Sequence, residues 1–382
     1  MVLSVDDLLE KARKATGLED FGDPFFLTGL AHLVASFNVD CPLNDLGRQA
    51  AEGMLLENLI NRLQIEDWYR RHPEIDDEVI RDPVFIVGLP RTGTTVLGTL
   101  LGLDRDSRCL RNWEINQPCP PPDERVRDDP RIAAANRRIA EMNKLVPGLA
   151  DALPRTVDSN MADECFFLLN MSFASVAFNG IFHVPSYEDW ALTEGLPEID
   201  ASYGYHKRIL KLLQWKTPAR RWVLRTPIHS GNMGALIHHY PDARFIWTHR
   251  PPEKVLPSIC SLIYQVRALY HRSQDPAELG RRQLFQWSTF MRRLIRDRER
   301  IGDARFIDVR HGDFIADPEA VIGDLYRWLG WHLDDDFIQQ IRAWREGNPR
   351  GRHKPDPAFF GLNEQSIDQA FATYRQQFQA WL

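Results

Sequence analysis

The fold of this chain is decided by one stretch, which reads Val84-Phe-Ile-Val-Gly-Leu-Pro-Arg-Thr-Gly-Thr-Thr-Val-Leu-Gly-Thr-Leu-Leu101. Its first four residues are apolar and predict a buried strand of a parallel sheet. Gly88, Pro90 and Gly93 then predict a turn, and apolar residues at helical spacing resume from Thr94. A strand, a glycine turn and a helix together point backbone N–H groups and a helix N-terminus at an anion, which we expect to be a phosphate.

The loop departs from the P-loop of nucleoside-triphosphate enzymes in the position of its cation. A P-loop ends in Gly-Lys-Ser/Thr, and its lysine reaches the β- and γ-phosphates. Here Gly88 and Gly93 keep the glycine spacing, Thr94 takes the lysine position, and the cation stands earlier, at Arg91. This arrangement favours a ligand with one 5′-phosphate and a sulfonyl group over the triphosphate of a small-molecule kinase.

The loop resembles the phosphosulfate loop of the PAPS-dependent sulfotransferases (PAPS is 3′-phosphoadenosine 5′-phosphosulfate), which reads Pro-Lys/Arg-Ser/Thr-Gly-Thr-Thr. The six residues that match this pattern, and that the resemblance implies bind PAPS and its product PAP, are Pro90, Arg91, Thr92, Gly93, Thr94 and Thr95. The resemblance is to the bacterial branch of the family. It implies an α/β fold with a three-layer parallel sheet flanked by helices, similar to the P-loop NTPases, with additional N-terminal and inserted helices.

A second pair of residues follows the strand predicted at residues 243–250. Arg250 ends this strand, and Ser258 stands eight residues later on a helix that begins at Pro252. The pair resembles the second signature of the family, in which an arginine and a serine hold the 3′-phosphate. Arginine can offer that phosphate a bidentate fork, and serine can add a short hydrogen bond.

Two residues are alternative candidates for the general base. Glu114 lies a short way past the helix of the loop, and it resembles the base of the glutamate-using branch, which includes the tyrosylprotein sulfotransferases. His229 stands two positions beyond the histidine base of the cytosolic branch. The strand predicted at residues 222–229 carries Arg225 where the family has a lysine. The resemblance therefore implies that Arg91 and Arg225 stabilise charge on the transferring sulfonyl group while Glu114 or His229 takes the acceptor proton.

Two further matches concern the nucleotide. His311 stands where the family usually has a tyrosine that meets the adenine, and an imidazole can also stack on a base. Arg350, Gly351 and Arg352 resemble the C-terminal segment that closes over the 3′-phosphate. These four residues are therefore predicted to contact PAPS.

Composition excludes several other classes of protein. The chain has 382 residues, a net charge of -6 and 43% hydrophobic residues, so no basic field favours nucleic acid or a membrane surface. Its five cysteines are odd in number and lack CxxC spacing, which indicates neither a disulfide framework nor a zinc site. No signal peptide and no membrane span are expected. We therefore expect a cytoplasmic enzyme. No metal ion is expected in the reaction that the resemblance implies, because the arginines and the helix terminus supply the positive charge.

The organisation of the chain is predicted in two parts. Residues 1–80 show helical periodicity and are predicted to form a helical cap or packing layer. Residues 81–382 are predicted to form the α/β domain, with a helical insertion on the acceptor side at about residues 125–215. Within it, residues 161–178 are rich in phenylalanine and could form core or a wall of an apolar pocket, and residues 186–196 are predicted to form a loop.

The resemblance implies transfer of a sulfonyl group from PAPS to a hydroxyl, or less often an amine, of a small-molecule or lipid acceptor. PAP would be released. Two alternatives stay open at this point. A P-loop kinase would need a lysine at Thr94 and an acidic residue for Mg²⁺. A non-catalytic nucleotide-binding protein would keep the phosphate loops but would not need Glu114 or His229.

Overall fold

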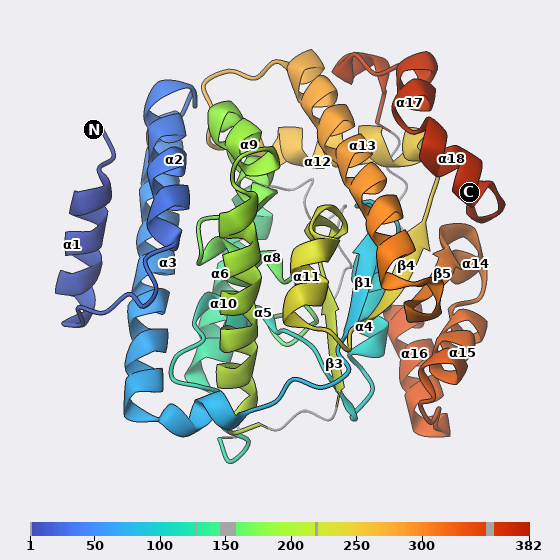
Figure 1. Ribbon diagram of the computed structural model, residues 1–382, viewed down its shortest axis with the longest axis horizontal. Coiled ribbons are helices and arrows are strands. Elements are labelled where there is room, and N and C mark those ends of the chain that lie inside the picture. The colour runs from blue at the N-terminus through green and yellow to red at the C-terminus, as the bar shows by residue number, and fades with distance from the viewer. Residues whose placement is uncertain (1, 127, 146–157, 218–220, 349–354) are drawn as a thin grey trace.

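A five-stranded parallel sheet forms the centre of the molecule (Figure 1). The structure is a computed structural model that describes residues 2–126, 128–145, 158–217, 221–348 and 355–382. The strands lie in the order β2-β3-β1-β4-β5, so the strand quoted above is the central one. Their bounds are β1 Val84–Gly88, β2 Ser107–Arg108, β3 Arg221–Arg225, β4 Arg244–His249 and β5 Phe306–Arg310.

Helices cover both faces of this sheet, because alternate residues of each strand point to opposite sides. Val84 and Ile86 of β1 pack against α4 (Thr94–Leu101), α15 (Pro318–Leu329) and α16 (Asp335–Gly347). Phe85 and Val87 pack on the other side, in a larger core shared with α10 (Leu196–Gln214), α11 (Met233–His239), α12 (Pro252–Ala268) and α13 (Pro276–Ile301). The predicted three-layer α/β fold is therefore confirmed.

The N-terminal helices extend the larger core sideways. They are α1 (Val5–Thr16), α2 (Phe26–Val39) and α3 (Asp45–Arg71), and they stand at the blue edge of Figure 1. α2 packs against α9 (Pro185–Leu192) and α10, and their apolar side chains belong to the same core as the sheet. The division of the chain at residue 80 into a helical layer and an α/β domain stays a prediction. The apolar side chains before and after that residue belong to one packed core.

Most predicted elements agree with the structure to within a few residues. The strand predicted at residues 222–229 is shorter, because β3 ends at Arg225 and Pro227 begins the 3-10 helix η3 (Pro227–Gly231). The loop predicted at residues 186–196 is wrong, since Pro185 starts α9 there. The remaining helices are α5 Asn112–Asn116, α6 Pro130–Leu145, α8 Phe166–Asn170, α14 His311–Ala316, α17 Glu364–Ala370 and α18 Ala372–Phe378. Within the described residues, every helix is too short or too polar to cross a membrane.

Candidate functional site

The loop between β1 and α4 has the backbone geometry that its glycines allow. Gly93 has φ 92° and immediately precedes α4, and Arg91 also lies in the left-handed region, with φ 62°. Gly88 must be glycine, since a Cβ there would lie 2.5 Å from the carbonyl oxygen of Thr248 on β4. The Thr92 hydroxyl donates to the Leu89 carbonyl within the loop at 2.7 Å, and it fastens the loop to the sheet because it lies 2.6 Å from the hydroxyl of Thr248 on β4. The N-terminus of α4 is therefore held at the carboxyl edge of the sheet.

A cavity of about 740 Å³ opens beside this loop. We name two parts of its lining. The loop wall consists of Pro90, Arg91, Gly93, Thr94, Thr95, Arg250, Ser258 and His311. The apolar wall consists of Phe166, Val176, Ala177, Gly180, Ile181, Ile228, Ile259, Leu262, Ile263, Val266 and Trp287. One continuous cavity therefore joins most of the predicted phosphate-binding residues to a set of apolar side chains.

The two predicted phosphate signatures meet in the loop wall. Arg91 Nε donates to Ser258 Oγ at 3.2 Å, and Arg250 Nη1 donates to the carbonyl oxygen of Arg91 at 2.7 Å. Burial lowers the pKa of the Arg91 guanidinium, and the charge of Arg250 lowers it further. Burial also lowers the pKa of Arg250. Two cations held side by side at the N-terminus of a helix are suited to an anion of high charge.

Arg225 at the end of β3 lies behind the cavity rather than in its lining. Its side chain crosses α4 at Gly98, where a Cβ would lie 2.5 Å from Arg225 Cδ. Arg225 Nη1 donates to Glu164 Oε1 at 2.7 Å and to Thr95 Oγ1 at 3.3 Å, and Nη2 donates to the carbonyl oxygen of Ala162 at 2.9 Å. Arg225 thus links the start of α4 to the segment that precedes α8.

Glu164 is a cavity residue that the sequence analysis missed. It lines the cavity with a side chain that is 21% exposed, and its carboxylate accepts hydrogen bonds from Arg225 and from Thr226 Oγ1 at 3.0 Å. Burial raises the pKa of Glu164 above its ordinary value, and the Arg225 charge opposes this effect only in part. Glu164 connects the two walls. Arg225 donates both to its carboxylate and to Thr95 of the loop wall, and Phe166 of the apolar wall follows two residues later in the chain. The only signal in the sequence is an acidic residue at the start of the phenylalanine-rich segment.

Glu114 is placed elsewhere, which corrects the prediction that it faces the acceptor. It is 1% exposed and does not line the cavity. Its carboxylate accepts from Arg108 Nη1 at 2.8 Å and from the backbone N–H of Arg111, the N-cap residue of α5, as the third helical residue of a capping box. The buried ion pair with Arg108 and the bond to the start of α5 give Glu114 a structural role. A substrate cannot reach a carboxylate enclosed in this way.

His229 is also enclosed, contrary to the prediction that it stands at the site. It is fully buried in η3, where Phe85 packs edge-on against its ring and Nδ1 lies 2.8 Å from the Tyr203 hydroxyl. Burial lowers its pKa well below the ordinary value, so the ring stays neutral. Its neighbours Pro227 and Ile228 reach the cavity and His229 does not.

The remaining predicted residues have mixed placements. His311 lines the cavity next to the loop, and a Cβ on Gly93 would lie 3.4 Å from its ring. Thr92 is fully buried and does not line the cavity. Arg350, Gly351 and Arg352 lie outside the described residues.

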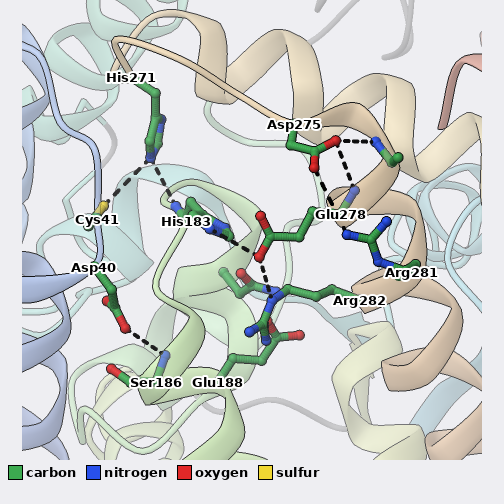
Figure 2. A network of polar contacts seen from close by, with 12 residues as sticks. Asp40, Cys41, His183, Ser186, Glu188, His271, Asp275, Glu278, Arg281 and Arg282 are labelled. Atoms are coloured by element: carbon green, nitrogen blue, oxygen red, sulfur yellow. Dashed lines mark hydrogen bonds and ion pairs between the residues drawn. The ribbon is translucent and has the colours of Figure 1, made fainter. Parts of the chain in front are cut away.

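A polar network connects α13 to the segment before α9 (Figure 2). The His271 ring accepts from the backbone N–H of His183 at 3.0 Å, and the His183 ring lies 3.5 Å from the Glu278 carboxylate. The same region holds the buried Arg267, which donates to Asn179 Oδ1 at 2.6 Å. Asn179 belongs to η2 (Val176–Gly180), and its neighbours form part of the apolar wall. The network therefore anchors that wall.

Two solved structures of sulfotransferases are similar to this chain. STF9 from Mycobacterium avium superposes with a TM-score of 0.89 and 30% identity, covering 98% of this chain and 96% of that one. STF1 from Mycobacterium tuberculosis superposes with a TM-score of 0.85 and 30% identity, covering 97% of this chain and 99% of that one. Among curated proteins, the omega-hydroxy-beta-dihydromenaquinone-9 sulfotransferase Stf3 of Mycobacterium bovis and Mycobacterium tuberculosis is 26% identical over 280 residues, which are 71% of this chain and 68% of Stf3. The model of the sulfotransferase family matches residues 83–335, and the chain therefore belongs to that family.

Proposed function

We propose that this sulfotransferase takes its sulfonyl group from PAPS and delivers it to a hydroxyl of an apolar, lipid-like acceptor. The observation that carries this proposal is the continuous cavity, because it joins a cationic loop wall to an apolar wall with Glu164 between them. The name of the relative Stf3 describes an acceptor of this type, a hydroxylated menaquinone derivative.

The loop wall suits a donor with two separate anionic groups. In our proposal, the backbone N–H groups of residues 92–95 and the N-terminus of α4 bind the 5′-phosphosulfate. Arg250 and Ser258 bind the 3′-phosphate, and Arg91, whose Nε donates to Ser258, lies between this site and the 5′-phosphosulfate. His311 would contact the adenine. Arg350, Gly351 and Arg352 remain predicted contacts, and no metal is expected because these groups supply the positive charge.

Glu164 takes the place of Glu114 and His229 as the proposed general base. Its carboxylate accepts the proton of the acceptor hydroxyl while the acceptor oxygen bonds to sulfur and the bond from sulfur to the phosphate oxygen breaks. The products are a sulfate ester and PAP. Loop N–H groups and Arg91 stabilise the charge that develops on the departing phosphate oxygen.

Arg225 and Thr226 act as positioning residues for this base. Both donate to the Glu164 carboxylate, so they orient its oxygens, and Arg225 couples the carboxylate to Thr95 of the loop. The raised pKa of Glu164 makes the ionised carboxylate a stronger proton acceptor than an ordinary glutamate. This assignment moves Arg225 from contact with the sulfonyl group to the support of Glu164.

The acceptor would lie along the apolar wall. Phe166, Ile181, Leu262 and Trp287 offer aromatic and aliphatic contacts to a hydrocarbon body, which needs no charged partner. Five residues of this wall come from the region predicted as an acceptor-side insertion, namely Phe166, Val176, Ala177, Gly180 and Ile181. A cytoplasmic location fits a PAPS-dependent enzyme and is part of the proposal.

Calorimetric titration with PAP, and with ATP plus Mg²⁺, tests the donor assignment. We expect micromolar binding of PAP that does not change with Mg²⁺. Binding of ATP–Mg²⁺ without binding of PAP would contradict it. The acceptor class is tested by incubating the protein with radiolabelled PAPS and a series of primary n-alkanols. Catalytic efficiency should rise with chain length, and a flat or falling series would exclude an apolar acceptor site.

A further inference from the structure

Two glutamines interrupt the otherwise apolar side of the cavity. Gln283 and Gln286 lie on α13 and line the cavity together with Trp287. Residues at i, i+3 and i+4 share one helix face, so all three side chains point the same way. Gln283 is 1% exposed and Gln286 is 4% exposed, which is unusual for carboxamides unless they are hydrogen-bonded.

The orientation of the Gln283 amide follows from its one partner. Trp287 Nε1 donates to Gln283 Oε1 at 2.8 Å, and an indole N–H can only donate, so the oxygen must face Trp287. The NH₂ group of Gln283 therefore points elsewhere. In the described part of the chain, neither this NH₂ group nor the Gln286 carboxamide has a hydrogen-bond partner.

These amides are open to the cavity rather than sealed. Some carboxamides of the protein, such as those of Asn58 and Asn170, contain a polar atom that has neither a partner nor accessible surface. The Gln283 NH₂ group and both amide atoms of Gln286 have no partner in the described part of the chain and are not among those atoms, so they keep accessible surface. Because both residues are almost completely buried and line the cavity, that surface faces the cavity.

The helix that carries the glutamines is held firmly on two sides. Gly280 lies so close to the backbone of Phe360 that a Cβ would be 1.9 Å from its carbonyl oxygen. One turn past Gln286, Phe290 packs on Gly231 of η3, where a Cβ would be 2.4 Å from the ring. The amides therefore cannot find protein partners by a small shift of α13.

We propose that Gln283 and Gln286 form a polar subsite that recognises a second oxygen of the acceptor, distinct from the hydroxyl that is sulfonated. Gln283 offers only a donor, which selects a carbonyl, ether or hydroxyl oxygen, and Gln286 offers a donor and an acceptor. The acceptor is then an apolar alcohol with an oxygen function further along its body, and not a plain hydrocarbon alcohol. This inference rests on the proposed function and narrows its acceptor class.

The test compares acceptors that differ only in the second oxygen. The probes are n-dodecanol and three hydroxyketones of the same chain length, with the carbonyl near the hydroxyl, at the middle and at the far end. Sulfonation is measured with radiolabelled PAPS, and binding is measured by calorimetry on the PAP-loaded protein. We expect at least one hydroxyketone to exceed dodecanol in kcat/KM by about 10- to 100-fold, because an unmatched buried amide penalises the ligand that lacks the oxygen.

Variants tie this preference to the two side chains. Gln283→Met and Gln286→Met keep the length of the side chain and remove the amide, and each should bring the ratio of hydroxyketone to dodecanol down towards one. Gln265→Met is the matched control, because Gln265 lies on α12 outside the cavity lining and donates to Ser261. This control should retain the ratio. Thermal unfolding of each variant shows that it is folded.

Each other outcome contradicts a defined part of the account. Equal use of all four probes by the unaltered protein, or a preference that survives both substitutions, overturns the subsite and leaves the proposed function standing. A loss of PAP affinity in the glutamine variants would assign the amides to the donor and overturn the subsite as well. Binding of none of the probes by PAP-loaded protein would overturn the subsite and the apolar acceptor class together. Failure to bind PAP would remove the proposed function itself.

Discussion

The loop wall and the apolar wall of the cavity are built in different ways. The key groups of the loop wall stand just beyond the ends of strands, since Arg250 and His311 directly follow β4 and β5, and Arg91 comes three residues after β1. The apolar wall collects residues from α8, η2, η3, α12 and α13, whose positions relative to one another depend on how these helices pack. This difference teaches that the anion-binding groups are placed by the local backbone at the ends of strands. The shape of the apolar part of the cavity depends instead on the packing of helices that are distant in the sequence.

Two glutamates make the same contrast at the level of single residues. Glu114 pairs with Arg108 of β2 and Glu164 pairs with Arg225 of β3, each at a distance below 3 Å between nitrogen and oxygen. The Glu114 pair is sealed between helix and sheet, while the Glu164 carboxylate reaches the cavity. Similar ion pairs can therefore serve stability in one place and, in our proposal, chemistry in the other.

The largest effect is expected for Glu164→Gln. The amide cannot accept the acceptor proton, so kcat for a long-chain alkanol should fall by about 100- to 10,000-fold. PAP affinity measured by calorimetry should stay close to that of the unaltered protein, because the hydrogen bonds of the Glu164 carboxylate come from Arg225 and Thr226, which are not part of the proposed 3′-phosphate site. Normal turnover by this variant would exclude Glu164 as the base.

Glu114→Gln is the matched control and should behave in the opposite way. It weakens the partner of the buried Arg108 and should lower the free energy of unfolding by about 2 to 3 kcal/mol, measured by denaturant titration. Turnover per folded molecule should be retained at a temperature where the variant is folded. A stable variant without turnover would return the base role to Glu114.

A smaller effect is expected for the donor side. Arg250→Ala removes a guanidinium from the loop wall and should weaken PAP binding by about 10- to 100-fold in calorimetry. Arg327→Ala is the control, since Arg327 is exposed and pairs with Asp324 on the surface of α15. Equal affinities of these two variants would contradict the assignment of Arg250 to a phosphate.

Gly180→Leu tests the apolar wall alone. No atom lies within 4 Å of a Cβ placed on Gly180, so the added side chain fits without strain and projects next to the cavity lining. The KM for long-chain alkanols should rise by about tenfold, while PAP affinity is retained. If PAP affinity falls and the KM for alkanols does not change, the two walls have been assigned the wrong way round.

The polar network that connects α13 to the segment before α9 gives a prediction about stability. Burial raises the pKa of Glu188 to about 7 from the usual 4.5, although Arg282 lies 3.1 Å away (Figure 2). Between these two pH values the folded state binds more protons than the unfolded state, so this carboxyl lowers stability as the pH rises. Glu188→Gln should remove that contribution, which amounts to at most about 3 kcal/mol.

Urea titrations at several pH values check this effect. The difference in unfolding free energy between Glu188→Gln and the unaltered protein should grow in favour of the variant from pH 5 to pH 7. Glu278→Gln, which removes a more exposed carboxylate that also contacts Arg282, is the control. A difference in unfolding free energy that stays constant with pH would contradict the raised pKa of Glu188.

Much of this architecture could be predicted from the sequence. The parallel sheet, the central strand Val84–Gly88 and the sulfotransferase family are confirmed, because buried strands, glycine turns and loop motifs are encoded locally. Glu164 and the glutamines of α13 could not be found in this way. A lone acidic residue has no pattern, and only the packing of α4, β3 and η2 decides that Glu164 is open to the cavity while Glu114 is enclosed.

The pH dependence of kcat, compared between the unaltered protein and Glu164→Gln, tests the central claim most directly. The base must be ionised, and burial raises the pKa of Glu164, so activity should fall with decreasing pH at values above the ordinary range of a glutamate. The residual activity of Glu164→Gln should lack this acid limb. An identical acid limb in both proteins would show that another group accepts the proton and would contradict the account.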